Sequence, residues 1–442
     1  MQQTFDEALE EFLTRSRQLL HHESQEDIPP PHPAPLARGR VPVPSAFLLT
    51  PESISRYAAT IGDDNPVYTD DRYARSTRHG SLIAPGPILV HARYPGDHGA
   101  QRAIGYPVAN FLSGVAWDFY DVLRPGMQFE SSKIPRELVV AGGRQGRTIS
   151  HHSETFYWDN RGELKAKSYG RLLHIPVEQM GGRRVMPPDR LGERMFYDYE
   201  PYEYSDSEIA AIETALAGET RRGAMPRWWE DVSVDDELPA IVQPPYSVRD
   251  EMTYQSLHHG LIAAFDGTRL VRAFRPAYER CRENADFART HPITGWPYTP
   301  YDEHEDRHLS AYRCEPLPFD FGVQRAQIPM RLLTNWAGDD AFVRRMYTSM
   351  RRPVFYGDTV TFTGIVRRKY QLDLDDEHGR AASYHAVAVE ITGVNQRGEV
   401  HCLGYGSVLL PSREFGPPEL PLPHDDRPPY VPFDTHRRAE WF

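Results

Sequence analysis

The sequence predicts an α+β fold built from two copies of one domain. Residues 160–173 have the sequence NRGELKAKSYGRLL, and residues 396–409 have the related sequence QRGEVHCLGYGSVL at a constant offset of 236 residues. In each copy a helix, a loop and a second, apolar helix precede several segments rich in Val, Thr, Phe and Tyr. One central helix followed by a run of antiparallel strands is typical of an α+β domain.

The repeat also sets the expected domain boundaries. Residues 50–62 align with residues 248–260 at an offset of 198, so the second copy carries extra residues, mostly within 261–303. Each copy is too long to be one unit of a solenoid and is therefore expected to be a domain. The predicted parts are an N-terminal helix with a proline-rich arm (1–45), a first domain that we call block one (46–180), a linker with a short helix (181–226), a second domain that we call block two (227–412) and a proline-rich C-terminal arm (413–442).

Within the blocks, local patterns predict the individual elements. A central apolar helix is expected at residues 85–91 (PGPILVH) in block one, and from about residue 322 to Trp336 in block two, where Gly338 would end it. Strands are expected after each central helix, for example at 359–366 and 383–393.

The composition excludes several classes of protein. The 442 residues include 50 Lys and Arg against 62 Asp and Glu, a net charge of −12, with no basic block, so nucleic acid is not expected as a partner. No run of about 18 apolar residues and no signal-peptide pattern occurs, which predicts no membrane span and a cytoplasmic location. Cys281, Cys314 and Cys402 are far apart and odd in number, which indicates thiols rather than a disulfide framework.

Motifs in both blocks point to one family. Residues 62–70 are GDDNPVYTD and residues 83–86 are IAPG, while residues 124–126 (RPG) and 352–359 (RPVFYGDT) form a second pair. These motifs resemble those of the MaoC-like hot-dog dehydratases, the (R)-specific enoyl-CoA hydratases, whose pattern is G-D-x-N-P-x-H-x-D followed by I-x-H-G. The resemblance covers both blocks. It implies a double hot dog in one chain, with each antiparallel sheet wrapped around one long helix.

The resemblance implies a hydro-lyase that acts on an acyl thioester. In the family, an aspartate and a histidine five residues later add water to a 2-enoyl thioester or remove it from a 3-hydroxyacyl thioester. Backbone N–H groups at the start of the central helix polarise the thioester carbonyl, and Gly86 or Gly322 would supply them here. No metal and no redox cofactor is implied, since coenzyme A or phosphopantetheine belongs to the substrate.

The two blocks depart from the family pattern in opposite ways. Block one keeps Asp63 and Asn65, the latter expected to orient the loop, but Tyr68 stands at the histidine position. Block two keeps the histidine as His304, whereas Thr299 stands five residues earlier, at the aspartate position. Each block therefore holds one half of the catalytic pair.

Three ways to complete the pair remain open. His304 works with a carboxylate of its own insert, Asp302 or Asp266; or Asp63 works with Tyr68 or His91; or hydration has been lost. We expect the first, with His304 as the proton-transfer residue. The alternatives without catalysis are that Asp63 caps a turn and that His304 is a solvated loop residue.

Two further patterns bear on ligands. Arg351 and Arg352, with other arginines nearby in the sequence, are candidates to bind the phosphates of an acyl carrier. Residues 304–308 (HEDRH) also match H-E-x-x-H, but their loop-like surroundings disfavour a zinc site, so no metal ligand is predicted.

Three functions follow as hypotheses. The first is a hydratase or dehydratase acting on an acyl-CoA or carrier-bound thioester. The second is a specialised dehydratase or cyclase acting on a polyfunctional acyl substrate. The third is a non-catalytic thioester-binding subunit that needs a partner chain. The resemblance also implies a homodimer as one arrangement.

Overall fold

The computed structural model describes residues 4–23, 47–100, 108–143, 146–176, 199–257, 291, 293–294, 302–312, 315–439 and 441–442. The predicted arm at 27–46 and most of the insert at 261–303 lie outside these residues, as do Thr299, Asp266, Cys281 and Cys314. Cys402 is buried with a free thiol. None of the described helices is long and apolar enough to cross a membrane.

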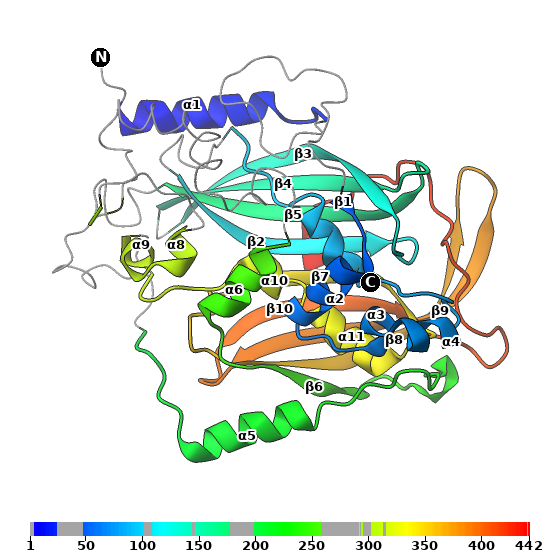
Figure 1. The fold of residues 1–442 in the computed structure, drawn as a ribbon. Coiled ribbons are helices and arrows are strands. Elements are labelled where there is room, and N and C mark those ends of the chain that lie inside the picture. The colour runs from blue at the N-terminus through cyan, green and yellow to red at the C-terminus, as the bar shows by residue number, and fades with distance from the viewer. Residues whose placement is uncertain are drawn as a thin grey trace.

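One ten-stranded antiparallel sheet runs through both blocks (Figure 1). Its order is β1-β3-β4-β5-β2-β7-β10-β9-β8-β6, so strands at equivalent positions of the two blocks appear in mirrored order. The blocks join where β2 pairs with β7, from Gly114–Asp118 to Arg345–Ser349. The strands are β1 (Phe47–Leu48), β2 (Val108–Phe119), β3 (Gln128–Gly143), β4 (Gly146–Trp158), β5 (Leu164–Pro176), β6 (Glu237–Gln243), β7 (Phe342–Met350), β8 (Val360–Asp375), β9 (Ala381–Asn395) and β10 (Val400–Leu409).

This repeated order confirms the predicted fold class, since each block contributes five antiparallel strands that pack on helices. The alternation of buried and exposed side chains is strongest along β8 and β9, which extend past the core as a hairpin. Most of the described core residues form one hydrophobic cluster shared by both blocks. The domain boundaries themselves stay a prediction.

Both central helices are shorter than the expected long helix. In block one it is a 3-10 helix, η1 (Gly86–His91); in block two it is split into α10 (Gly322–Arg325) and α11 (Pro329–Ala337). Pro329 explains the split in block two, because it has no N–H to donate and so interrupts the hydrogen bonds that would join α10 to α11. Pro87 lies in the first turn of η1, where proline is tolerated, and does not explain the length of that helix. Gly338, with φ of +83°, ends α11 as predicted.

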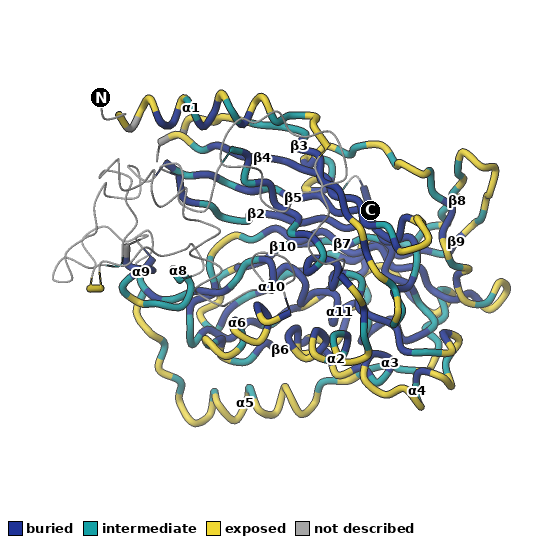
Figure 2. Tube along the Cα trace, turned by 45° about the horizontal axis from the view of Figure 1, so that its top comes forward, coloured by how far each residue is buried: buried dark blue, intermediate teal, exposed yellow. Residues whose placement is uncertain are grey.

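The remaining helices occupy the core side of the sheet, its edges and its outer side (Figures 1 and 2). In Figure 2, α5 is largely exposed beside β6, whereas α1 is buried along one side only. These helices are α1 (Phe5–Gln18), α2 (Pro51–Thr60), α3 (Pro66–Thr69), α4 (Asp71–Ser76), α5 (Asp206–Ala217), η4 (Trp229–Asp231), α6 (Val248–Gln255), α8 (Asp302–Glu305), α9 (Arg307–Tyr312) and α12 (Phe433–Arg437).

Two terminal segments pack on the sheet. The amphipathic helix α1 buries Phe12 and Leu13 against Val108 and Ile149. The C-terminal arm folds back so that Trp441 and other aromatic side chains bury against β2, β5 and β7. The arm is therefore part of the packed structure and covers the strands through which the two blocks join.

Candidate active site

The loop of block one is built from its own motif residues. Gly62, with φ of +71°, turns the chain after α2, and Asp63 Oδ1 accepts the N–H of Asn65 at 3.0 Å. Asn65 Oδ1 in turn accepts the N–H of Val67 at 3.1 Å and thereby caps α3, which begins at Pro66. Asp63 and Asn65 therefore both have structural roles.

Asp63 is nevertheless an unusual carboxyl group. It is 2% exposed, its Oδ2 has no hydrogen-bond partner among the described residues, and burial raises its pKa to about 6. The Arg331 guanidinium, from α11 of block two, opposes that rise. Arg331 donates to the carbonyl oxygens of Ile61 and Gly62 at 3.1 and 2.9 Å and so holds the loop that carries Asp63.

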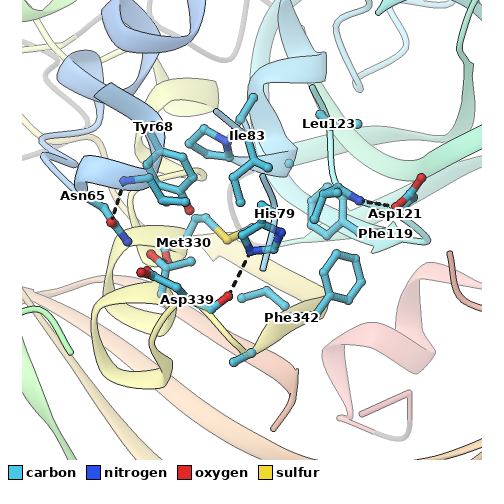
Figure 3. A pocket seen from close by; sticks show the side chains of 18 of the residues that line it. Asn65, Tyr68, His79, Ile83, Phe119, Asp121, Leu123, Met330, Asp339 and Phe342 are labelled. Atoms are coloured by element: carbon cyan, nitrogen blue, oxygen red, sulfur yellow. Dashed lines mark hydrogen bonds between the residues drawn. The ribbon is translucent and has the colours of Figure 1, made fainter. Parts of the chain in front are cut away.

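The structure brings Asn65, Tyr68 and Gly86 together around one small cavity between the blocks (Figure 3). The cavity encloses about 70 Å³, room for no more than a few water molecules. His79 also lines it and contacts the carbonyl oxygen of Asp339 through Nε2 at 3.0 Å. Burial lowers the pKa of His79, which favours a neutral imidazole.

Phe119 closes this cavity against the start of η1. A Cβ placed on Gly86 would lie 2.5–2.8 Å from three atoms of the Phe119 ring. The ring therefore lies directly on Gly86, where the family would place the thioester. Neither Asp63 nor His91 lines this cavity, and the His91 ring packs among Tyr57, Tyr254 and Phe47.

Block two presents its histidine at the start of the central helix. His304 Nδ1 lies 3.2 Å from the carbonyl oxygen of Phe319 and 3.1 Å from that of Asp320. Its ring packs on Phe319 and Phe321, with centroid distances of 4.3 and 5.3 Å. The next residue, Gly322, begins α10, so His304 is fixed against the residues that lead into this helix.

Gly322 is not covered as Gly86 is. The nearest heavy atoms to a Cβ built on Gly322 are Arg325 Nη2 and Leu112 O, both at 3.8 Å, an ordinary contact distance. Asp320, just before it, accepts the N–H of Val354 at 2.8 Å and pairs with Arg325 at 3.0 Å. This brace holds the backbone at the helix start, and its Arg325 side chain is one of the two nearest groups to the glycine.

The predicted partners of His304 are only partly placed. Asp302 lies on α8 two residues before His304, whereas Asp266 and Thr299 fall outside the described residues. A buried carboxyl group that the sequence did not single out, Glu251 on α6, also belongs to this part of the fold. In the sequence, Glu251 is marked only as one of the acidic residues in the first turn of helix α6.

The arginines do not form one phosphate-binding patch. Arg351 and Arg352 are exposed at the end of β7, and Arg352 pairs with Glu399 at 2.5 Å. Arg331 is buried between the blocks, and Arg345 pairs with Asp118 at 3.1 Å. Of these four arginines, only Arg351 and Arg352 are thus exposed and remain candidates to bind the phosphates of an acyl carrier.

The H-E-x-x-H pattern does not assemble a metal site in the described part of the chain. His304 Nδ1 contacts backbone carbonyls, and the His308 ring lies near His291 instead, at 6.3 Å. The one metal-sized cluster of acidic and histidine side chains among the described residues is an exposed group at Glu377, His378 and Asp426.

Comparisons with known proteins agree with this architecture. Residues 39–167 match the family model described as the FAS1-like dehydratase domain region. A comparison with curated protein sequences gives no match.

Among solved structures, a MaoC-like dehydratase superposes with a TM-score of 0.56 at 14% identity, covering 89% of this chain and 99% of its own. A putative MaoC domain dehydratase from Chloroflexus aurantiacus gives 0.47 at 13% identity, with 84% and 93% covered. A Mycobacterium tuberculosis protein described as a double hot dog gives 0.43 at 12% identity, with 83% and 94% covered. Only the first of these three exceeds a TM-score of 0.5, and at its identity it establishes the fold alone.

The chain is thus a double hot-dog protein, with two α+β repeats that share one continuous sheet. The family match in block one and the shared fold confirm the predicted resemblance to the MaoC-like dehydratases. The family match covers block one, and for the whole chain the comparisons establish the fold.

Proposed function

We propose that the chain hydrates a 2-enoyl thioester, or dehydrates a 3-hydroxyacyl thioester, in the cleft of block two. The observation that carries the proposal is the position of His304, held at 3.1–3.2 Å by the carbonyl oxygens of residues 319 and 320, just before Gly322, whose Cβ position has its nearest described neighbours at 3.8 Å. Hydro-lyase chemistry requires a positioned proton-transfer group beside fixed backbone donors, and these residues supply both.

The contacts of His304 define its protonation. Both partners of Nδ1 are carbonyl oxygens, which only accept hydrogen bonds, so Nδ1 carries a proton. In the neutral ring, Nε2 then has the lone pair and acts as the base. In the dehydration direction it removes the proton at C2, while the backbone N–H groups at Gly322 stabilise the enolate oxygen of the thioester.

Block one has a supporting role in this proposal. Phe119 covers the glycine at its helix start, and Asp63 and Asn65 cap local structure. Coenzyme A or a phosphopantetheine arm would carry the acyl group, with Arg351 and Arg352 as the surface cations offered to its phosphates.

A steady-state assay of the full chain on a series of 2-enoyl-CoA esters tests this assignment. His304→Ala is expected to lower kcat by about 10²- to 10⁴-fold, the usual contribution of general acid–base catalysis. His308→Ala is the matched control, since this histidine also follows the insert but contacts neither residue 319 nor residue 320, and it is expected to stay within about threefold of wild type. Equal loss in both variants would refute the role of His304, and an inert wild type would favour the thioester-binding subunit.

A further inference from the structure

A buried carboxyl group on α6 stands close to the start of the second central helix. Glu251 has no exposed surface. Gln255 Nε2 donates to its Oε1 at 2.7 Å, and the Tyr356 hydroxyl donates to its Oε2 at 3.2 Å. Within the described residues no lysine, arginine or histidine forms an ion pair with it, so it is held by neutral donors alone.

A second carboxyl group shares one of these donors. Gln255 Nε2 also lies 3.4 Å from Glu305 Oε1, and Glu305 directly follows His304 on α8. Burial, and then the negative charge of Glu305, raise the pKa of Glu251 well above its usual range. Two carboxyl groups at one amide cannot both ionise easily, so burial and this neighbouring charge favour the protonated form of Glu251.

The surroundings of Glu251 and of His304 meet at residues 318–321. Tyr356, which donates to Glu251, also donates its N–H to the carbonyl oxygen of Pro318 at 2.9 Å. Its ring lies 5.6 Å from that of Tyr246, whose hydroxyl is 3.5 Å from the N–H of Phe321. The His304 ring packs on the same Phe321, and its Nδ1 lies 3.1 Å from the carbonyl oxygen of Asp320, the residue just before Phe321.

We propose that Glu251 is the carboxyl partner of His304 and replaces the aspartate that block two lacks at Thr299. The inference rests on the proposed function and adds a residue from a different element, helix α6 instead of the loop. In the family pattern both groups come from one loop, whereas here the tertiary structure brings the acid from a helix some fifty residues upstream.

His304 and Glu251 together account for both protons that move in the reaction. In dehydration, His304 takes the proton from C2, and the electrons of that C–H bond form the enolate of the thioester. Protonated Glu251 gives its proton to the hydroxyl at C3, the C3–O bond breaks, water leaves and the C2=C3 double bond forms. The imidazolium then returns its proton to the Glu251 carboxylate. No redox partner takes part.

A pH profile of kcat separates this role from a structural one. An acid must be protonated to act, so wild-type activity is expected to fall as pH rises through the raised pKa of Glu251. Glu251→Gln keeps the size and the contacts to Gln255 and Tyr356, and is expected to lower kcat by about 10²- to 10³-fold and to remove this alkaline limb. Asp250→Asn, which disturbs only the N-cap of the same helix, is the matched control and is expected to keep the limb.

Tyr356→Phe is a second test of the role of Glu251, for the case that Glu251→Gln folds poorly. The Tyr356 hydroxyl lowers the pKa of Glu251, so its removal is expected to shift the alkaline limb to higher pH. A Glu251→Gln enzyme with kcat within threefold of wild type and an unchanged limb would overturn the proposal, as would a Tyr356→Phe limb that does not move. In either case loss of activity in His304→Ala would leave the hydro-lyase function standing, whereas an inert wild type would remove both.

Discussion

Block one and block two match opposite halves of the family motif, and the described cavity lies beside the helix start of block one. Block one retains Asp63 and Asn65, yet they cap a turn and a helix, and Phe119 lies on Gly86. Block two has Thr299 at the aspartate position, Gly322 meets only ordinary contacts among the described residues, and His304 contacts the carbonyl oxygen of Asp320 nearby. A loop motif that matches the family therefore describes the geometry of the loop, whereas contacts from distant residues decide what lies beside each helix start.

The largest expected effect concerns the turn that carries the block-one motif. Gly62→Ala would put an alanine where the backbone is in the left-handed region, and its Cβ would overlap the Arg331 guanidinium. This guanidinium is buried and donates hydrogen bonds to the carbonyl oxygens of Ile61 and Gly62. We expect a loss of about 3–5 kcal/mol in the free energy of unfolding, from backbone strain and displaced charged hydrogen bonds.

Gly80→Ala is the matched control for that substitution. Gly80 also has positive φ, +66°, but no atom lies within 4 Å of its Cβ position, so only the strain of about 1–2 kcal/mol remains. Urea unfolding of both variants measures the difference. Equal losses would show that Arg331 does not hold the block-one loop.

The next effect tests the buried acid of block one. The folded chain binds the Asp63 proton more tightly than the unfolded chain does, because its pKa is about 6 against a usual 3.8. Wild type therefore loses stability as pH rises from about 4 through about 6, by about 2–3 kcal/mol. Asp63→Asn has no charge to bury and is expected to be more stable than wild type at pH 8 but not at pH 3. Denaturant unfolding at both pH values checks this, and a pH-independent difference would contradict it.

The smallest expected effect comes from substituting the glycine at each of the two helix starts and comparing the stability of the two variants. Gly86→Ala forces a methyl group against the Phe119 ring and is expected to cost about 1–3 kcal/mol of stability. Gly322→Ala meets only ordinary contacts at 3.8 Å and is expected to stay within about 0.5–1 kcal/mol of wild type. Thermal unfolding of the pair measures the contrast. If Gly322→Ala proved the more damaging, block two would be the closed cleft.

Much of the fold was predictable because it is repeated. The offset between residues 160–173 and 396–409 located β5 and β10, which occupy equivalent places in the two halves of the sheet. The stop at Gly338 followed from local backbone preference. The lengths of the central helices were not predicted; in block two, Pro329 lacks the N–H that would continue the helix from α10 into α11.

The site was predicted less completely, for a reason that particular residues show. His304, Asp63, Asn65 and Tyr68 were found because family motifs mark short stretches of chain. His79, Phe119 and Glu251 lie in no such stretch. Their importance depends on what faces them, such as the Asp339 carbonyl for His79.

By itself, the sequence determined the duplication, the α+β class, the likeness to the MaoC-like dehydratases and which block matches the aspartate or the histidine of the family motif. These depend on local patterns, which the order of residues records directly. Only the tertiary structure decided that Phe119 lies on Gly86, that Gly322 meets only ordinary contacts among the described residues, and that Gln255 contacts both Glu251 and Glu305, the neighbour of His304. Those facts depend on contacts between distant segments, which burial and close packing select and which no short motif encodes.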